Sequence, residues 1–216
     1  MRPMFITFEG GEGSGKSVQA RLLAESLQQK GISVVQTKEP GGTEVGLELR
    51  KILVQGDKDK LDCISEMLLY YADRRMHLTS KIWPALKENK WVISDRYADS
   101  TVAYQYYGYD CRIEKSLLEK MYQIVAGNFK PDLTIILDIA PEEGLKRSFA
   151  KAKTMNEKEL RFEQMDLQFH QNIRRGFLQI AKAEPERCVV VDASGTVQEI
   201  HESIKQLLAQ RIGLEL

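Results

Sequence analysis

A glycine-rich segment near the N-terminus has the residue types and spacing that bind phosphate. Residues 10–17 match the pattern GxxxxGK[ST], with a predicted strand at residues 5–8 and a predicted helix from residue 16. Glycines let backbone N–H groups turn inward around an anion, and the helix N-terminus adds partial positive charge. We expect Lys16 to contact the β- and γ-phosphates of a nucleotide and the Ser17 hydroxyl to ligate Mg²⁺. The residues expected to bind the nucleotide are Gly10, Gly11, Glu12, Gly13, Ser14, Gly15, Lys16 and Ser17.

A carboxylate and a guanidinium stand side by side after a later predicted strand, residues 91–94. Phosphoryl transfer asks the protein for positioning and charge neutralisation rather than for covalent help. Asp95 can hold Mg²⁺ through water, and the planar fork of Arg96 can bind an acceptor phosphate or the charge in transit. A structural ion pair at the end of the strand is the alternative. Beside a phosphate-binding loop, the pair favours a small kinase.

Other nucleotide-binding classes fit less well. A GTPase would carry a guanine-reading NKxD motif after a later strand, and the sequence has none. A DxxG sequence at residues 192–195 follows the last predicted strand, too late in the chain to act as a switch. A kinase for another nucleotide or a deoxynucleoside, and a nucleotide-dependent switch that transfers nothing, remain as alternatives.

The elements that position these residues alternate along the chain. Short apolar strands are predicted at residues 5–8, 32–35, 91–94, 133–137 and 188–191. Helical periodicity covers residues 16–30, 45–54, 64–87 and 197–211, and Pro84 should kink or break the third of these helices. This alternation predicts an α/β fold of the P-loop kinase type, with a five-stranded parallel sheet and helices on both faces. Ligands of such sheets bind at the carboxyl ends of the strands.

Composition sets broad limits on the protein. The 216 residues suit one domain, residues 1–216, and 31 Lys and Arg balance 31 Asp and Glu, so we expect no nucleic-acid partner. Cysteines at 63, 111 and 188 are odd in number and form no CxxC pair, which argues against a disulfide framework or a zinc site. No apolar run approaches the roughly 20 residues of a membrane helix, and no targeting signal is recognisable. We therefore predict a cytoplasmic protein without a membrane partner.

The motifs together resemble those of bacterial thymidylate kinases, from residue 5 to about residue 204. The shared segments are EGGEGSGKS at 9–17, KEPGGT at 38–43, LLYYADRR at 68–75, DRYADSTVAYQ at 95–105 and LRFE at 160–163. The resemblance implies transfer of the γ-phosphoryl group of ATP to dTMP, giving ADP and dTDP, with Mg²⁺ as cofactor. It also implies a homodimer that pairs through helices, for which residues 64–87 could supply a face.

The resemblance also implies roles for residues around the acceptor. Glu12 should approach the 3′-hydroxyl of the acceptor sugar, and Glu39 begins the loop beneath the acceptor nucleotide. Arg50 should reach the monophosphate. The family usually has Arg before that Glu, whereas Lys38 stands here.

A second group of residues should recognise the base and sugar. Tyr70 and Arg74 lie four residues apart, hence on one helix face. By resemblance, they stack on thymine and bind its carbonyl edge, with Tyr in place of the more usual Phe. Thr101 and Gln105 should contact the base, and Tyr104 should crowd the sugar 2′-position, which favours deoxynucleotides.

Residues 147–161 are rich in Lys and Glu and predict a mobile lid. The family type with an acidic phosphate-binding loop generally draws a catalytic arginine from the lid. Lys151 and Lys153 occupy the stretch where arginines are expected, which leaves Arg147 and Arg161, and we favour Arg161. The loop at 192–195 should pass the adenine of ATP. The three histidines show no ligand spacing and receive no role.

Overall fold

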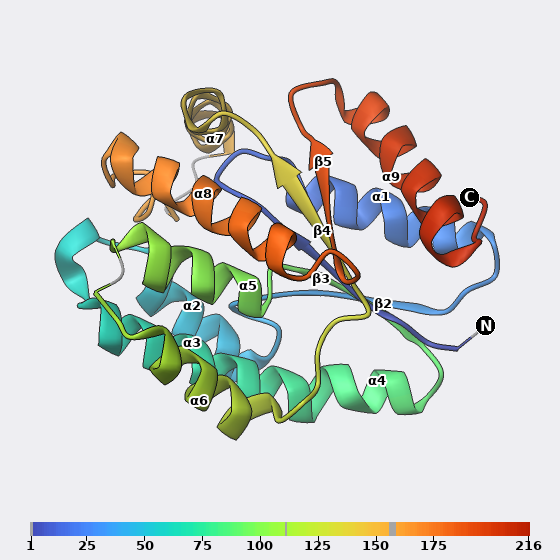
Figure 1. Cartoon of the computed structure of the whole chain (residues 1–216), viewed down its shortest axis with the longest axis horizontal. Helices are drawn as coiled ribbons and strands as arrows, with labels where there is room; N and C mark the ends of the chain where they lie inside the picture. The colour runs from blue at the N-terminus through green and yellow to red at the C-terminus, as the bar shows by residue number, and fades with distance from the viewer. Residues whose placement is uncertain (1, 111, 156–158) are drawn as a thin grey trace.

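Five parallel strands form the centre of the molecule. The structure, a computed structural model, describes residues 2–110, 112–155 and 159–216. The strands are β1 (Phe5–Glu9), β2 (Val34–Lys38), β3 (Trp91–Asp95), β4 (Leu133–Asp138) and β5 (Cys188–Asp192). Their order is β2-β3-β1-β4-β5, with every neighbouring pair parallel (Figure 1). The predicted five-stranded parallel sheet is confirmed.

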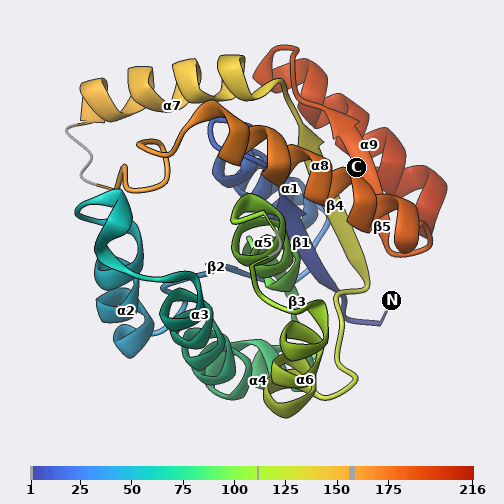
Figure 2. The ribbon, with the colours of Figure 1, turned by 60° about the vertical axis from the view of Figure 1, so that its left-hand side comes forward.

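Helices cover both faces of this sheet (Figures 1 and 2). The α-helices are α1 (Lys16–Gln29), α2 (Glu44–Val54), α3 (Cys63–His77), α4 (Trp83–Lys87), α5 (Ala98–Thr101), α6 (Lys115–Ala126), α7 (Pro141–Met155), α8 (Leu167–Ala183) and α9 (Val197–Ile212). A 3₁₀ turn, η1 (Lys58–Lys60), and two π-helical segments, η2 (Leu78–Ile82) and η3 (Val102–Gly108), complete the described elements.

Alternation along the central strand divides the core. Phe5 packs with the helices on one face of the sheet, whereas Ile6 and Phe8 pack with α1 and α9 on the other. All five residues of β1 are buried, as expected for a strand covered on both sides. The hydrophobic core therefore fixes β1, and the loop that follows β1 starts from a rigid base.

Most predicted boundaries agree with the structure to within one residue, and two predicted elements differ by more. The second strand begins at Val34 rather than at residue 32, because Gly31 and Ile32 still donate to carbonyls of α1 as its C-terminal cap. The long helix predicted for residues 64–87 is interrupted by η2, before Pro84. The proline lies in the first turn of α4, directly after η2, so the helix type changes next to Pro84 while the helical run continues to Lys87.

The carboxyl ends of three neighbouring strands bring distant segments together. Phe8 pairs with Asp95, and Lys38 pairs with Asp95 from the other side, so residues 10–17, 96–105 and 39–43 all start from one edge of the sheet. The first part of the predicted lid, residues 147–155, is the second half of α7, whereas residues 156–158 lie outside the described residues. Cys63 and Cys188 are free thiols, and Cys111 also lies outside that range.

Within the described ranges, no helix is long and apolar enough to cross a membrane.

Candidate active site

At two points, the phosphate-binding loop combines a backbone conformation and a close contact that together only glycine allows. Gly10 and Gly13 adopt φ angles of 138° and 66°. A Cβ at Gly10 would come within 2.4 Å of the Leu137 carbonyl oxygen, and one at Gly13 within 1.9 Å of the Gly144 carbonyl oxygen. The loop is therefore wedged against β4 and α7, and the glycine spacing of the motif follows from this close backbone contact.

Lys16 lies inside the curve of this loop. Its Nζ donates to the Gly11 carbonyl at 2.6 Å and to Ser14 Oγ at 3.1 Å. Burial lowers the pKa of Lys16 to about 8, and the positive charge of Arg96 adds to the effect. The negative charge of a phosphate bound here would stabilise the ammonium form of Lys16.

Ser17 and Asp95 meet at the end of β3. The Ser17 hydroxyl donates to the Asp95 carboxylate. Across the described ranges, no group of three or more His, Cys, Asp or Glu could cage a metal ion by itself. Mg²⁺ usually takes only one or two protein oxygens and completes its shell with water and substrate phosphates. Two hard oxygen ligands beside a phosphate-binding loop fit that ion.

Arg96 links the loop to η3. Its Nη1 donates to the Gly10 carbonyl at 2.9 Å and to Ser100 Oγ at 3.1 Å, and its Nη2 donates to Glu12 at 3.1 Å and to the Tyr104 hydroxyl at 2.9 Å. The guanidinium also lies 4.9 Å from the centre of the Tyr104 ring. The backbone of Arg96 has φ 69°, a left-handed conformation that costs energy for an arginine. Such strain is common where a side chain must point into a site.

Glu12 is held as a carboxylate within this group. Burial alone would favour its neutral form, but Arg96, Lys16 and a 2.5 Å hydrogen bond from Tyr104 lower its pKa to about 2. Glu12 is therefore an ionised hydrogen-bond acceptor at every physiological pH.

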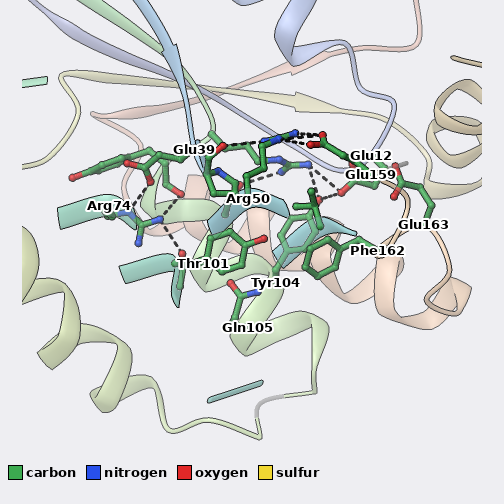
Figure 3. Close-up of a pocket in the computed structure, with 16 residues that line it drawn as sticks. Glu12, Glu39, Arg50, Arg74, Thr101, Tyr104, Gln105, Glu159, Phe162 and Glu163 are labelled. Atoms are coloured by element: carbon green, nitrogen blue, oxygen red, sulfur yellow. Dashed lines mark hydrogen bonds and ion pairs between the residues drawn. The ribbon is translucent and has the colours of Figure 1, made fainter. Parts of the chain in front are cut away.

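A cavity lies between this group and helices α2, α3 and η3 (Figure 3). Its lining contains every residue predicted to bind the acceptor, namely Glu39, Arg50, Tyr70, Arg74, Arg96, Thr101, Tyr104 and Gln105, together with Glu12. Glu159, Phe162 and Glu163, from the segment after α7, also line it. Residues spread over more than a hundred positions in the sequence therefore share one cavity.

Arg74 is the fixed donor in one part of this cavity. Its side chain is buried, with Nε on Glu39 at 2.9 Å and Nη2 on the Thr101 hydroxyl at 2.9 Å and the Tyr97 carbonyl at 3.1 Å. Among the described residues Nη1 has no hydrogen-bond partner. Gln105 donates to Glu66 at 2.6 Å, which fixes the amide in the cavity wall.

Arg50 lines another part of the cavity and is paired with Glu159 (Figure 3). The closest contact, from Nη2 to Oε2, is 2.6 Å, and Nε donates to the same carboxylate at 2.9 Å. Nη1 donates to the Pro40 carbonyl at 3.0 Å. A guanidinium that binds a carboxylate with two nitrogens has the geometry that also binds phosphate.

The sequence and the fold both match known proteins. The family model described as thymidylate kinase matches residues 8–204. The chain is 45% identical to the thymidylate kinase of Magnetococcus marinus over 94% of each chain, and 44% identical to that of a Synechococcus species over 97% of each. The chain belongs to the thymidylate kinase family.

A solved structure agrees with this assignment. The crystal structure of thymidylate kinase from Ehrlichia chaffeensis superposes with a TM-score of 0.76 at 36% identity, covering 96% of this chain and 99% of that one. The predicted P-loop kinase fold is thus confirmed, as is the predicted membership. Thymidylate kinases are nucleoside monophosphate kinases, and they transfer the γ-phosphoryl group of ATP to dTMP.

Arg161 does not occupy the place predicted for a catalytic cation, and it does not line the cavity. Its side chain is only 1% exposed, and Nη1 pairs with Glu66 at 2.7 Å. The guanidinium also donates to the carbonyls of Leu53, Asp57 and Lys58. We correct the prediction: Arg161 joins the segment after α7 to α2 and α3, and its donors are used in doing so.

Arg147, the other arginine considered in the predicted lid, points to the end of β5. It donates to the carbonyls of Ala193 at 2.8 Å and Ser194 at 2.9 Å. These residues belong to the loop expected to pass the adenine of ATP. The structure therefore ties α7 to that loop.

Several residues of the site carry a weak signal in the sequence. His77 is fully buried and contacts Glu39, and its only signal is its position three residues after Arg74 on the same helix face. Burial, then the charge of Glu12, raises the pKa of Glu163 to about 7. Glu9 accepts from the Tyr97 N–H at 2.8 Å, and its burial, followed by repulsion from a neighbouring acid, raises its pKa to about 8. An acid that ends an apolar strand was the available signal for Glu9.

Proposed function

We propose that this protein transfers the γ-phosphoryl group of ATP to dTMP at the cavity described above, with Mg²⁺ as cofactor. The observation that carries the proposal is that the phosphate-binding loop and the predicted acceptor residues meet at one place, with Glu12 and Arg96 common to both. In-line transfer needs donor and acceptor phosphates held side by side in this way.

The donor side rests on residues 10–17 and the end of β3. Lys16, buried within the loop, neutralises charge on the β- and γ-phosphates. Ser17 and Asp95 would hold Mg²⁺, which when bound neutralises phosphate charge and orients the γ-phosphoryl group. Arg96, beside both, neutralises charge as the phosphoryl group moves.

The acceptor side uses the rest of the cavity. Arg50 binds the acceptor phosphate, which displaces the Glu159 carboxylate from the guanidinium. Ionised Glu12 accepts a hydrogen bond from the sugar 3′-hydroxyl. Tyr104 limits space at the sugar. Tyr70, Arg74, Thr101 and Gln105 are assigned to the base, and Glu39 begins the loop beneath the acceptor nucleotide.

One assay separates the alternatives. The protein is incubated with Mg-ATP and, in turn, each nucleoside monophosphate, dTMP and thymidine among them, and the products are separated by chromatography. We expect dTDP and ADP in equal amounts with dTMP, and a loss of at least about 100-fold in rate for Lys16→Ala. ADP formation that is independent of any acceptor would favour a nucleotide-dependent switch, and a faster reaction with another acceptor would favour a different kinase.

We further propose a homodimer formed by α2, α3 and α6. Large apolar side chains are exposed on all three helices, including Val45 at 57%, Ile64 at 50%, Leu68 at 47% and Ile124 at 74%. These helices lie next to one another on one side of the molecule (Figure 2). Sedimentation equilibrium should give twice the chain mass, and Leu68→Glu should give the chain mass with an unchanged circular dichroism spectrum. A wild-type monomer at micromolar concentration would refute the dimer.

We also propose that the enzyme acts in the cytoplasm, where free thiols such as Cys63 and Cys188 persist.

A further inference from the structure

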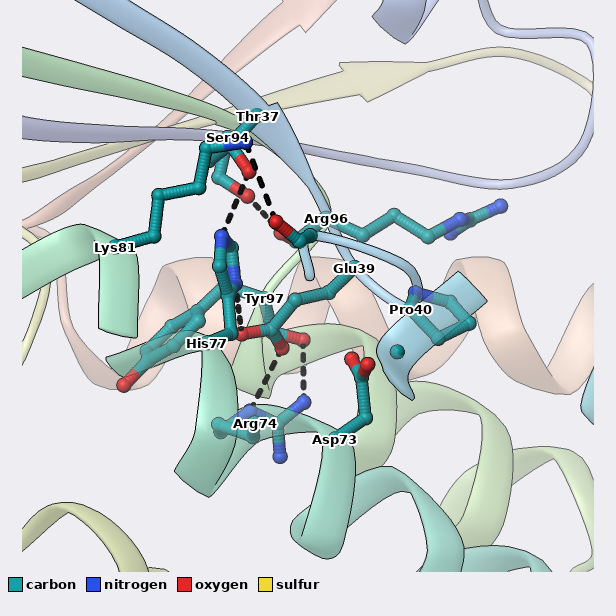
Figure 4. Close-up of polar contacts among 12 residues, drawn as sticks. Thr37, Glu39, Pro40, Asp73, Arg74, His77, Lys81, Ser94, Arg96 and Tyr97 are labelled. Carbon is teal, nitrogen blue, oxygen red and sulfur yellow. Dashed lines mark hydrogen bonds and ion pairs between the residues drawn. The ribbon is translucent and has the colours of Figure 1, made fainter. Parts of the chain in front are cut away.

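His77 lies behind the residues assigned to the base and holds one of them in place (Figure 4). Its Nδ1 lies 2.8 Å from Glu39 Oε1, and its Nε2 lies 2.7 Å from Thr37 Oγ1. Because an ionised carboxylate only accepts hydrogen bonds, Nδ1 carries the proton that Glu39 receives. Glu39 uses its other oxygen for Nε of Arg74, at 2.9 Å. A chain of hydrogen bonds therefore runs from β2 through the imidazole to the guanidinium.

The imidazole has no freedom to leave this position. His77 is fully buried at the last residue of α3. The loop after β2 closes directly on it, since a Cβ at Gly42 would lie 2.3 Å from the imidazole Cδ2. The same loop is held by the Gly41 N–H, which donates to Asp73 at 3.2 Å, and by Lys81, which donates to the Gly42 carbonyl at 3.2 Å. The ring is thus fixed by sterics as well as by its two hydrogen bonds.

The end of this chain is a donor without a protein partner. Three hydrogen bonds fix the plane of the Arg74 guanidinium, and each uses Nε or Nη2. Nη1 is buried and, within the described part of the chain, unbonded. A buried N–H without a partner is costly unless a ligand supplies an acceptor. Arg74 lines the cavity, so a ring carbonyl of a bound base is an acceptor of suitable chemistry.

We propose that His77 is a positioning residue for base recognition: by fixing Glu39 it orients Arg74 so that Nη1 meets a carbonyl oxygen on the pyrimidine edge. This inference rests on the proposed function and deepens it. It predicts preference for a pyrimidine with a carbonyl at that edge over one with an amino group there, because Arg74 can donate but never accept. Thr37 belongs to the same arrangement through its contact with Nε2.

Two substitutions separate positioning from simple filling of the core. In His77→Asn the amide nitrogen takes the place of Nδ1 and can still donate to Glu39, whereas in His77→Gln the amide reaches towards Thr37 and Nδ1 is lost. We expect His77→Gln to raise KM for dTMP about tenfold, the effect of one hydrogen bond to a charged group, and His77→Asn to raise it threefold or less. KM for ATP should stay within twofold in both. Thr37→Val, which keeps its shape, should raise KM for dTMP about threefold.

The decisive readouts are selectivity and coupling. The ratio of kcat/KM for dTMP to that for 5-methyl-2′-deoxycytidine monophosphate, which has an amino group in place of a ring carbonyl, should fall at least fivefold in His77→Gln. In an Arg74→Lys background, His77→Gln should cause no further loss, because the two changes act through one contact. Equal losses towards ATP and dTMP, or additive losses with Arg74→Lys, would overturn the inference.

The same measurements distinguish this inference from the proposed function. Wild-type enzyme that phosphorylates dTMP, together with His77→Gln and Thr37→Val variants whose KM for dTMP is unchanged, would overturn the role of His77 alone. Wild-type enzyme that neither binds dTMP by calorimetry nor phosphorylates it would overturn both. If His77→Gln does not fold, the Thr37→Val and His77→Asn results still decide, since positioning requires the first to weaken dTMP binding more than ATP binding.

Discussion

Replacing Arg96 by methionine should remove a stabilisation that the wild type has at neutral pH and loses in acid. Methionine keeps most of the length of the side chain and its contact with the Tyr104 ring but removes the charge next to Glu12. The wild-type pKa of Glu12, about 2 against an ordinary 4.5, corresponds to about 3 kcal/mol of preferential stabilisation of its carboxylate. Arg96 is the largest favourable contribution to that effect, because burial acts in the opposite direction.

The sign of the pH dependence follows from these pKa values. In the wild type, the stabilisation by ionised Glu12 is fully present above pH 4.5 and is lost only as the pH falls towards 2. Without Arg96, the pKa of Glu12 returns towards its unfolded value, because burial is then opposed mainly by Lys16 and Tyr104. The variant should therefore be about 3 kcal/mol less stable than wild type at pH 8. This deficit should persist to about pH 5 and fall by at least half at about pH 3, where wild type loses the same stabilisation.

Urea unfolding followed by circular dichroism between pH 3 and 8 measures this deficit. For a chain of this length, the loss at pH 8 corresponds to a melting temperature about 6–12 °C lower. The double variant Arg96→Met with Glu12→Gln is the matched control, because it has no carboxyl at position 12 whose protonation could change its stability. An Arg96→Met deficit that is equally large at pH 3 and pH 8, or a double variant no more stable than Arg96→Met at pH 8, would refute this account of the pair.

Three further predictions concern the metal, the donor site and the corrected arginine. Burial lowers the pKa of Lys16 to about 8, and only its ammonium form binds phosphate, so kcat/KM for ATP should fall tenfold per pH unit above about pH 8. The variant Lys16→Arg should not show this fall, and a wild-type pH profile that is flat to pH 9.5 would contradict the assignment. Asp95→Asn should raise the half-saturating Mg²⁺ concentration about tenfold in steady-state assays while KM for dTMP stays within twofold, and an unchanged Mg²⁺ requirement would remove Asp95 from the metal site. Arg161→Met leaves Glu66 buried without its partner and should lower the free energy of unfolding, measured in urea, by about 3–5 kcal/mol. Adding Glu66→Gln should restore most of this stability, and kcat of the folded double variant should be within about threefold of wild type. A thousandfold loss of kcat at normal stability would return Arg161 to a catalytic role.

The phosphate-binding loop and the end of β3 were predictable because their chemistry is local. The loop needs its glycines at fixed positions between a strand and a helix, and Asp95 and Arg96 follow directly after a strand. The strands were predictable because each is a short apolar run that can be recognised from its own residues. The start of β2 was misplaced because apolar Ile32 also suits the cap of α1, and the hydrogen bonds there favour the cap.

The roles of Arg161 and His77 were beyond sequence pattern because both depend on contacts between distant segments. Glu66 lies 95 positions before Arg161 in the chain, and nothing in either segment indicates that their side chains meet. From the sequence alone, His77 is one polar residue at the end of an amphipathic helix. Only the packing of the loop after β2 against α3 places its imidazole between Thr37 and Glu39.

Two guanidinium–carboxylate pairs of the cavity differ in exposure, and the difference agrees with the ligands that we propose for them. The pair of Arg50 with Glu159 is 22% and 25% exposed, so a phosphate dianion can displace the carboxylate with access to solvent. The pair of Arg74 with Glu39 is 1% and 2% exposed, and separating it would leave charges buried. A neutral base offers no charge to compensate for such a separation. In the proposed reaction, the buried pair would therefore stay closed beside the base, whereas the exposed pair would open and transfer its guanidinium to the acceptor phosphate.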